Sequence, residues 1–201
     1  MEIKITDLAS DQDALIAEIA SMLVDAFRQT APEAFPDIPT ATVEVQESFA
    51  PDRLSRVAID EEGNALGWIG GISCYKGNTW ELHPLVVRPD KQGHGIGRAL
   101  VADLERCVVE RGGKTVFLGC DDEQGQTSVG GADLYPDVWT HLKNIRNLRR
   151  HPYEFYQKLD FTIVGVIPDA NGFGKPDILM AKRLMTATSE TAVVGPGMGS
   201  V

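Results

Sequence analysis

The sequence is poor in cysteine, contains no long apolar run and has fewer basic than acidic residues. Its three cysteines, Cys74, Cys107 and Cys120, are widely spaced and have apolar neighbours. Neither a disulfide framework nor a zinc-ligand pattern follows from this spacing. We therefore expect no metal site, and we expect three buried, reduced thiols.

No apolar stretch is long enough to span a bilayer. Residues 1–7 alternate like a strand and lack the basic start and apolar core of a signal peptide, so we expect a cytoplasmic protein. The 19 basic residues are outnumbered by 29 acidic ones, which gives a net charge of −10. Such a surface repels nucleic acids and anionic membranes and attracts polycations, although it also simply keeps a protein soluble.

Apolar periodicity and turn residues predict an α/β fold. We expect one domain over residues 1–184 and a disordered tail over 185–201. The irregular residues 121–137 indicate either a functional loop or disorder. The sheet should be mixed, with an antiparallel N-terminal half and a βαβ crossover in the middle. The expected strands are 3–7, 54–60, 65–73, 80–88, 114–120, 162–167 and 177–184, and the expected helices are 11–29 (capped by Ser10 or Asp11), 40–49, 97–111 and 138–150.

The most informative segment is the glycine-rich turn that joins strand 80–88 to helix 97–111. It reads Gln92-Gly93-His94-Gly95-Ile96-Gly97-Arg98. Glycines let a backbone approach a diphosphate closely, and the first N–H groups of a helix point at it. The glycine order differs from a Rossmann fingerprint, and Gly97-Arg98-Ala99 does not supply the G-K-[ST] of a P-loop.

The order Gln92-x-x-Gly95-x-Gly97 resembles the acyl-CoA signature Q/R-x-x-G-x-G/A of the GCN5-related N-acetyltransferase (GNAT) family, over about residues 3–184. The resemblance implies the GNAT fold and acetyl-CoA as cosubstrate. It also implies that main-chain groups of Leu85, Val86 and Val87 pair with the pantetheine arm, with an N–H at or near Val86 polarising the thioester. The peptide N–H groups from Gln92 to Gly97, including those of Gly93, His94, Gly95 and Ile96, would hold the phosphates together with Arg98.

Three residues are candidates for proton transfer. The resemblance implies Glu81, on the strand before the turn, as the base that accepts the proton of the amine, directly or through a water. His83 competes for this role because it lies two residues on and titrates near neutrality. Residues 155–161, FYQKLDF, look like the family's F-Y-x-K-x-G-F, which implies Tyr156 as the acid for the leaving thiolate. Asp160 replaces the usual glycine there and tolerates a left-handed backbone.

The acceptor side is indicated by Asp121, Asp122 and Glu123, which follow a strand of the parallel pair, where α/β proteins place ligands. Adjacent carboxylates suit an acceptor with several ammonium groups, and Glu81 and His83 would line the same site. Asp133, Asp137 and Asp169 are further candidates without a spacing argument. The resemblance narrows to bacterial aminoglycoside 6′-N-acetyltransferases on five segments: 80–87 (WELHPLVV), 118–123 (LGCDDE), 133–135 (DLY), 150–156 (RHPYEFY) and 168–178 (PDANGFGKPDI).

This likeness implies acetylation of an aminoglycoside amine, and antibiotic resistance, by an enzyme that dimerises as many relatives do. Two other readings stay open. The acceptor could be a polyamine or another small amine, or the chain could be a non-catalytic acyl-CoA-binding module. Among aminoglycoside amines, the resemblance implies the 6′ amine as the one that is acetylated.

Overall fold

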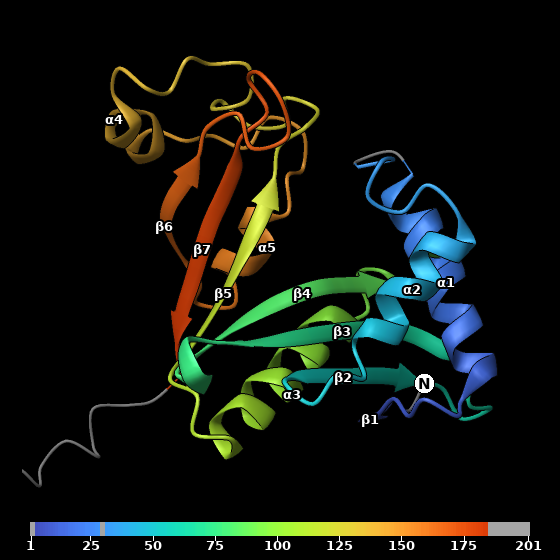
Figure 1. Cartoon of the computed structure of the whole chain (residues 1–201). Helices are drawn as coiled ribbons and strands as arrows, with labels where there is room; N and C mark the ends of the chain where they lie inside the picture. Colours follow the sequence, from blue (N-terminus) through green and yellow to red (C-terminus); the bar gives the residue numbers. More distant parts are fainter. Residues whose placement is uncertain (1–2, 29–30, 185–201) are drawn as a thin grey trace, which may run out of the picture.

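A seven-stranded mixed sheet organises the computed structural model (Figure 1), which describes residues 3–28 and 31–184. Its strand order is β1-β2-β3-β4-β5-β7-β6. The strands are β1 (Lys4–Asp7), β2 (Arg53–Ile59), β3 (Ala65–Cys74), β4 (Thr79–Val87), β5 (Thr115–Asp121), β6 (Thr162–Ile167) and β7 (Asp177–Arg183). The helices are α1 (Asp13–Phe27), α2 (Ile38–Glu47), α3 (Ile96–Glu110), α4 (Val138–Lys143) and α5 (Tyr153–Gln157), with short 3-10 turns η1 (Tyr75–Gly77) and η2 (Pro89–Lys91).

The N-terminal half of the sheet, β1 to β4, is antiparallel throughout. Helices α1 and α2 cover one face, where Leu23 and Val45 pack on Trp68 and Val86. Helix α3 covers the other face with apolar side chains spaced three and four residues apart, among them Leu100 and Leu104. Most apolar side chains of this half are therefore buried, whereas Glu81 and His83 of β4 remain partly exposed on the α2 side.

A bulge in β4 changes which side chains face each helix layer. Ile69 pairs with Leu85 and Gly71 with Leu82, so β4 has one more residue than β3 between these two pairs. Leu82, before the bulge, packs in the α3 core, whereas Val86, after it, packs against α1. Consequently Glu81 and Val86 point to the α1–α2 side although their numbers differ by five.

The C-terminal half continues the sheet through the crossover β4–α3–β5, whose two strands are parallel. Strand β7 pairs antiparallel with both β5 and β6. Helix α5 covers one face of this half, where Tyr153 and Tyr156 pack with the even-numbered residues of β5 and β7. The opposite face is more open, since Gly119 and Asp121 of β5 are exposed there.

The predicted α/β fold and its mixed sheet are confirmed, and most element bounds agree within three residues. Helix 138–150 is wrong in length, because α4 ends at Lys143 and the chain then pairs with the loop at 126–128. The predicted caps Ser10 and Asp11 are also wrong, since Gln12 holds the N-cap position of α1 without a side-chain bond. Residues 29–30 and the predicted tail at 185–201 lie outside the described residues. Of the three thiols, Cys107 and Cys120 are buried and Cys74 is half-buried.

Candidate active site

Strands β4 and β5 separate in the middle of the sheet, and this opening forms the centre of the site (Figure 1). They pair over only three residue positions, from Thr79 with Thr115 to Glu81 with Phe117. In the described part of the chain, the rest of β4 has no partner strand on its β5 side. Main-chain groups on this edge are therefore free to bind an extended molecule as an added strand does.

The register shows which residues present these groups. The N–H of Arg88 donates to the Leu66 carbonyl of β3, and Val86 lies opposite Trp68 of β3. Because main-chain groups alternate in direction along a strand, Leu85 and Val87 face the opening, whereas Val86 faces β3. The N–H of Leu85 is thus better placed than that of Val86, expected from the sequence, to meet a thioester oxygen.

The turn after β4 provides a row of free N–H groups. Those of Gly93, His94, Gly95, Ile96, Gly97 and Arg98 donate to no protein acceptor within the described residues. Gly93 (φ 81°) and Gly95 (φ 85°) have left-handed conformations that favour glycine, and Gly95 is the N-cap of α3. No protein atom lies within 4 Å of where a Cβ would stand on either glycine. The turn is therefore open and suited to an anion.

Gln92 differs from the role expected for it. Its backbone N–H donates to the Pro89 carbonyl at 3.4 Å, and its side-chain Nε2 donates to the Val87 carbonyl at 3.3 Å. Gln92 therefore ties the turn to the end of β4, and the row of free amides begins at Gly93. Arg98 is exposed and makes no ion pair with the described residues, so its guanidinium is available to a phosphate.

Helix α5 is attached to the end of β5 by His151. The buried His151 ring accepts a bond from the Tyr153 N–H at Nδ1, which leaves Nε2 to donate to the Asp121 carbonyl at 3.0 Å. Burial lowers the pKa of His151, in agreement with this neutral form. The side-chain amide of Asn147 donates a hydrogen bond to the His151 carbonyl and accepts one from the His151 backbone N–H. These bonds fix the position from which α5 presents Tyr156.

Tyr156 is 8% exposed and packs edge-on against the rings of Phe155 and Phe161. Burial, with a smaller effect of the nearby Cys120, raises its pKa above the ordinary value, so the hydroxyl stays protonated at neutral pH. Asp160, after the helix, has φ 68°, and the Phe161 N–H closes the helix end on the Tyr156 carbonyl. The prediction that Asp160 accepts a left-handed backbone is confirmed.

Glu81 is half-buried and lies at the last position where β4 and β5 pair, directly at the start of the opening. His83 is more exposed, and its Nε2 lies 3.8 Å from Oε1 of Glu44 on α2. The same Glu44 oxygen lies 3.8 Å from Arg53 and accepts no hydrogen bond from residues 3–28 or 31–184. Glu44 thus adds a carboxylate to the α2 side of the site. Glu44 could not be recognised as part of the site from its sequence position, because only the packing of α2 on the sheet brings it to His83.

The three acidic residues after β5 have different surroundings. Asp122 is fully buried, and its carboxylate accepts bonds from the N–H groups of Gln126 and Thr127 and from the Thr127 hydroxyl. It holds the loop together and is not available to an acceptor, contrary to our expectation. Asp121 is exposed and accepts a bond from Asn171, while Glu123 lies 4.0 Å from the Lys175 ammonium.

The remaining acidic candidates also have local roles. Asp137 caps α4 through the Thr140 N–H, and Asp169 accepts a bond from the Gly174 N–H. Asp133 accepts a weaker bond from the Tyr135 N–H. By contrast, Asp177 at the start of β7 pairs with Asp121 across the strands and was not expected from the sequence. Only the register of β7 on β5 brings it to the open face.

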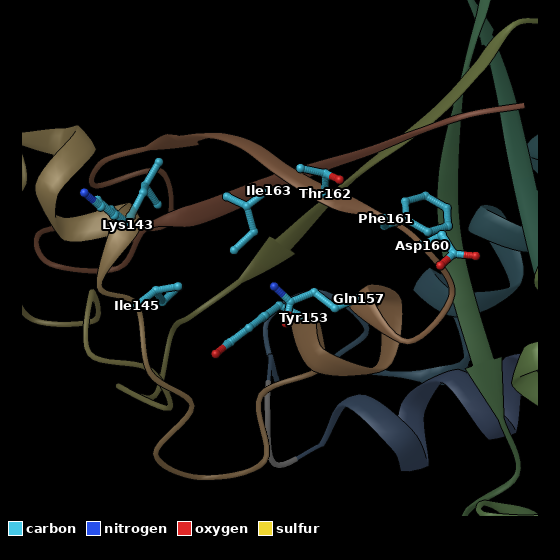
Figure 2. A pocket seen from close by; sticks show the side chains of 9 residues that line it. Lys143, Ile145, Tyr153, Gln157, Asp160, Phe161, Thr162 and Ile163 are labelled. Atoms are coloured by element: carbon cyan, nitrogen blue, oxygen red, sulfur yellow. The ribbon is translucent and has the colours of Figure 1, made fainter. Parts of the chain in front are cut away.

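A separate hollow of about 680 Å³ lies between α4, α5 and β6 (Figure 2). Tyr153 and Gln157 of α5 and Ile163 of β6 point toward it. None of the residues that the sequence assigned to cofactor, acceptor or proton transfer lines this hollow. Within the described residues, no three His, Cys, Asp or Glu side chains are arranged to hold a metal ion. No helix there is long and apolar enough to cross a membrane.

The fold, the open edge of β4 and the free amides before α3 define an acetyltransferase site, and comparison with known proteins agrees. Residues 17–130 match the model of the acetyltransferase (GNAT) family. The chain belongs to this family and is an N-acetyltransferase, as the sequence motifs predicted. A search of curated proteins found no match.

Among solved structures, the chain is similar to aminoglycoside 6′-N-acetyltransferases. One, solved in complex with coenzyme A, is 40% identical with a TM-score of 0.83. Another, from Enterococcus faecium, is 39% identical with a TM-score of 0.82. A third, an aminoglycoside 6′-acetyltransferase of type Ii, is 34% identical with a TM-score of 0.68. Each alignment covers 91% of this chain and 98% of the other.

Proposed function

We propose that this protein transfers the acetyl group of acetyl-CoA to a primary amine of an aminoglycoside, at the 6′ position. The use of acetyl-CoA is supported by the row of free N–H groups from Gly93 to Arg98, which lies at the end of an unpaired strand edge. The acceptor is supported by the likeness to the 6′-N-acetyltransferases and by the carboxylates around the opening.

On the cofactor side, the free amides and the Arg98 guanidinium bind the diphosphate of the coenzyme. Main-chain groups of Leu85 and Val87 pair with the pantetheine arm along the opening. The N–H of Leu85 stabilises the negative charge that develops on the thioester oxygen. Because the Val87 carbonyl already accepts a bond from Gln92, Val87 contributes mainly through its N–H.

On the acceptor side, Glu81 takes the proton that the ammonium group must lose before its nitrogen can attack. Its position at the start of the opening supports this role, either by direct contact or through one water. His83 and Glu44 line the neighbouring wall and offer a second route for the proton. The lone pair of the amine then attacks the thioester carbonyl, and the new C–N bond forms as the C–S bond breaks. The nitrogen releases its second proton to solvent as it becomes an amide, and solvent returns a proton to Tyr156 after the thiolate has taken one from it.

Tyr156 supplies the proton for the departing thiolate. Its hydroxyl donates no bond to the described residues and stays protonated, so the proton is available at the moment of C–S cleavage. The aromatic contacts and the His151 anchor hold the ring in place, which limits the reorganisation that the step requires.

Acetylation removes a positive charge and a hydrogen-bond donor capacity from the acceptor, which weakens its binding to anionic RNA and confers resistance. We further infer that the enzyme works in the cytoplasm, where acetyl-CoA is available, and that it forms a homodimer by analogy with relatives. Light scattering of the purified full-length chain measures its oligomeric state directly.

A thiol-release assay with acetyl-CoA tests the proposal against a panel of aminoglycosides and polyamines, with mass and NMR analysis of the product. We expect turnover with aminoglycosides and acetylation of the 6′ amine. Selective turnover of polyamines would reassign the acceptor.

The variant Glu81→Gln should lose turnover while its affinity for acetyl-CoA, measured by calorimetry, stays unchanged. The exposed Glu110→Gln serves as matched control. Acetyl-CoA binding without turnover of any amine would instead indicate a binding module.

A further inference from the structure

The carboxylate of Asp177 lies over the main chain of β5 because Gly119 has no side chain. A Cβ built on Gly119 would stand 2.7 Å from Oδ1 and 2.9 Å from Cγ of Asp177. Gly119 does not have a left-handed backbone, so its turn geometry does not demand glycine. The absent side chain therefore creates the space that the Asp177 carboxylate occupies.

This carboxylate forms no ion pair with the residues that the structure describes. Its Oδ1 is buried and makes no hydrogen bond in the described part of the chain. Among charged groups, Asp121 and Glu81 act on it, and both are acidic. Only the backbone N–H of Cys120 favours the charge of this carboxylate among the groups that act on it. Holding it beside two other carboxylates is unfavourable for the fold.

The position of Asp177 relative to Glu81 follows from the strand register. Glu81 of β4 lies opposite Phe117 of β5, and Gly119 and Asp121 follow Phe117 on the same open face. Asp177 pairs with Asp121, but its carboxylate leans back over Gly119, toward Glu81. The three carboxylates thus form a row that extends from the reacting end of the opening.

We propose that Asp177 binds a second ammonium group of the acceptor, away from the amine that is acetylated beside Glu81, and that Gly119 makes this possible. The inference rests on the proposed acetylation of an aminoglycoside. Asp177 thereby distinguishes acceptors with several amines from those with one. An ammonium ion beside the half-buried Asp177 carboxylate reduces the repulsion among the three carboxylates.

The test compares two acceptors. Kanamycin A carries several amines, whereas methyl 6-amino-6-deoxy-α-D-glucopyranoside carries only the amine that reacts. In the near-isosteric Asp177→Asn, KM for kanamycin A should rise about tenfold or more, as for loss of one charged hydrogen bond. The KM and kcat for the monoamine should stay within about twofold of wild type. The exposed Asp25→Asn on α1 is the matched control for loss of one negative charge.

The variant Gly119→Ala tests the geometry independently, because it keeps the carboxyl group and removes its space. It should raise KM for kanamycin A as Asp177→Asn does, with circular dichroism and melting temperature confirming the fold. Unchanged KM for kanamycin A in Asp177→Asn, or an equal rise for both acceptors, would overturn the inference. Failure of the wild-type enzyme to acetylate kanamycin A would instead count against the proposed function itself.

Discussion

The ring of Phe155 on α5 packs against the α-carbon of Gly97 on α3. A Cβ on Gly97 would stand 3.3 Å from Cζ of Phe155 and 3.6 Å from Cγ2 of Val87. The glycines of the turn therefore have different functions. Gly93 and Gly95 supply left-handed backbone in open space, whereas Gly97 allows α5 to approach the first turn of α3. Because Tyr156 follows Phe155, this contact connects the phosphate turn with the proposed acid.

The first prediction concerns this contact. Gly97→Val should displace Phe155 and with it the Tyr156 hydroxyl, and lower kcat about tenfold or more, since small misplacements of reacting groups are costly. Steady-state kinetics with saturating acetyl-CoA measures the effect. Gly97→Ala is the matched control, because a methyl group at 3.3 Å needs only a small shift and alanine favours the helix. Equal kcat for Gly97→Val and wild type would show that the contact does not position Tyr156.

The second prediction isolates the acid. Tyr156→Phe keeps the buried ring and its aromatic contacts but removes the proton donor. We expect kcat to fall about 100-fold, within the range for general acid catalysis, with acetyl-CoA affinity in calorimetry unchanged. Tyr75→Phe, at an exposed tyrosine, controls for loss of a hydroxyl elsewhere. A Tyr156→Phe enzyme with wild-type kcat would remove Tyr156 from the mechanism.

The third prediction concerns stability and pH at Asp177. Burial and repulsion by Asp121 raise the pKa of Asp177 to about 6, with a smaller contribution from Glu81 and an opposing one from the Cys120 backbone N–H. A carboxyl group whose folded pKa is raised stabilises the fold at acid pH and loses this contribution as pH rises through about 6.

Asp177→Asn should therefore melt at a higher temperature than wild type at pH 8. The difference should shrink as the pH falls from about 6 to about 3, below the ordinary aspartate pKa of about 3.9, where the wild-type carboxyl is protonated in both states. Thermal denaturation across this range, without acceptor present, gives the comparison. A variant that is less stable than wild type at pH 8 would mean that favourable contacts such as the Cys120 N–H outweigh burial and repulsion at Asp177.

The fourth prediction concerns Arg56, which is 7% exposed and joins three elements. Its guanidinium bonds Asp103 of α3 and Asp7 of β1. Burial alone would raise the pKa of Asp103, but hydrogen bonds from Arg56 and Arg106 outweigh it and hold the pKa below the ordinary value. Arg56→Met should lower the free energy of unfolding by about 2 kcal/mol at pH 7.

Because the pKa of Asp103 is lowered, the contribution of this pair is present at neutral pH and is lost as the pH falls through the folded pKa. Urea denaturation at pH 7 and at acid pH measures both effects. The exposed Arg28→Met controls for loss of a surface ion pair. A difference between wild type and Arg56→Met that persists unchanged in acid would contradict the assignment.

Some parts of the site follow from local sequence patterns, and others depend on contacts between distant segments. The turn at 92–98 could be predicted because glycine spacing and helix start are local properties. The alternation of β5 also held a signal that was missed: Asp122 continues the buried positions Leu118 and Cys120, and so could not face an acceptor.

Asp177, Glu44 and the change of face at the β4 bulge could not be predicted in this way. Asp177 depends on the register of β7 on β5, and Glu44 depends on how α2 packs beside His83. The bulge depends on the pairing of two strands over one extra residue, which shifts the facing groups from Val86 to Leu85. Each is set by contacts between segments that are distant in sequence.

The most direct test of the account is a crystal structure of the full-length protein with acetyl-CoA bound. We predict diphosphate oxygens within hydrogen-bond distance of the N–H groups between Gly93 and Arg98, and the acetyl group in the opening near Glu81. A diphosphate bound elsewhere, such as in the hollow between α4, α5 and β6 (Figure 2), with these N–H groups unused, would contradict the account.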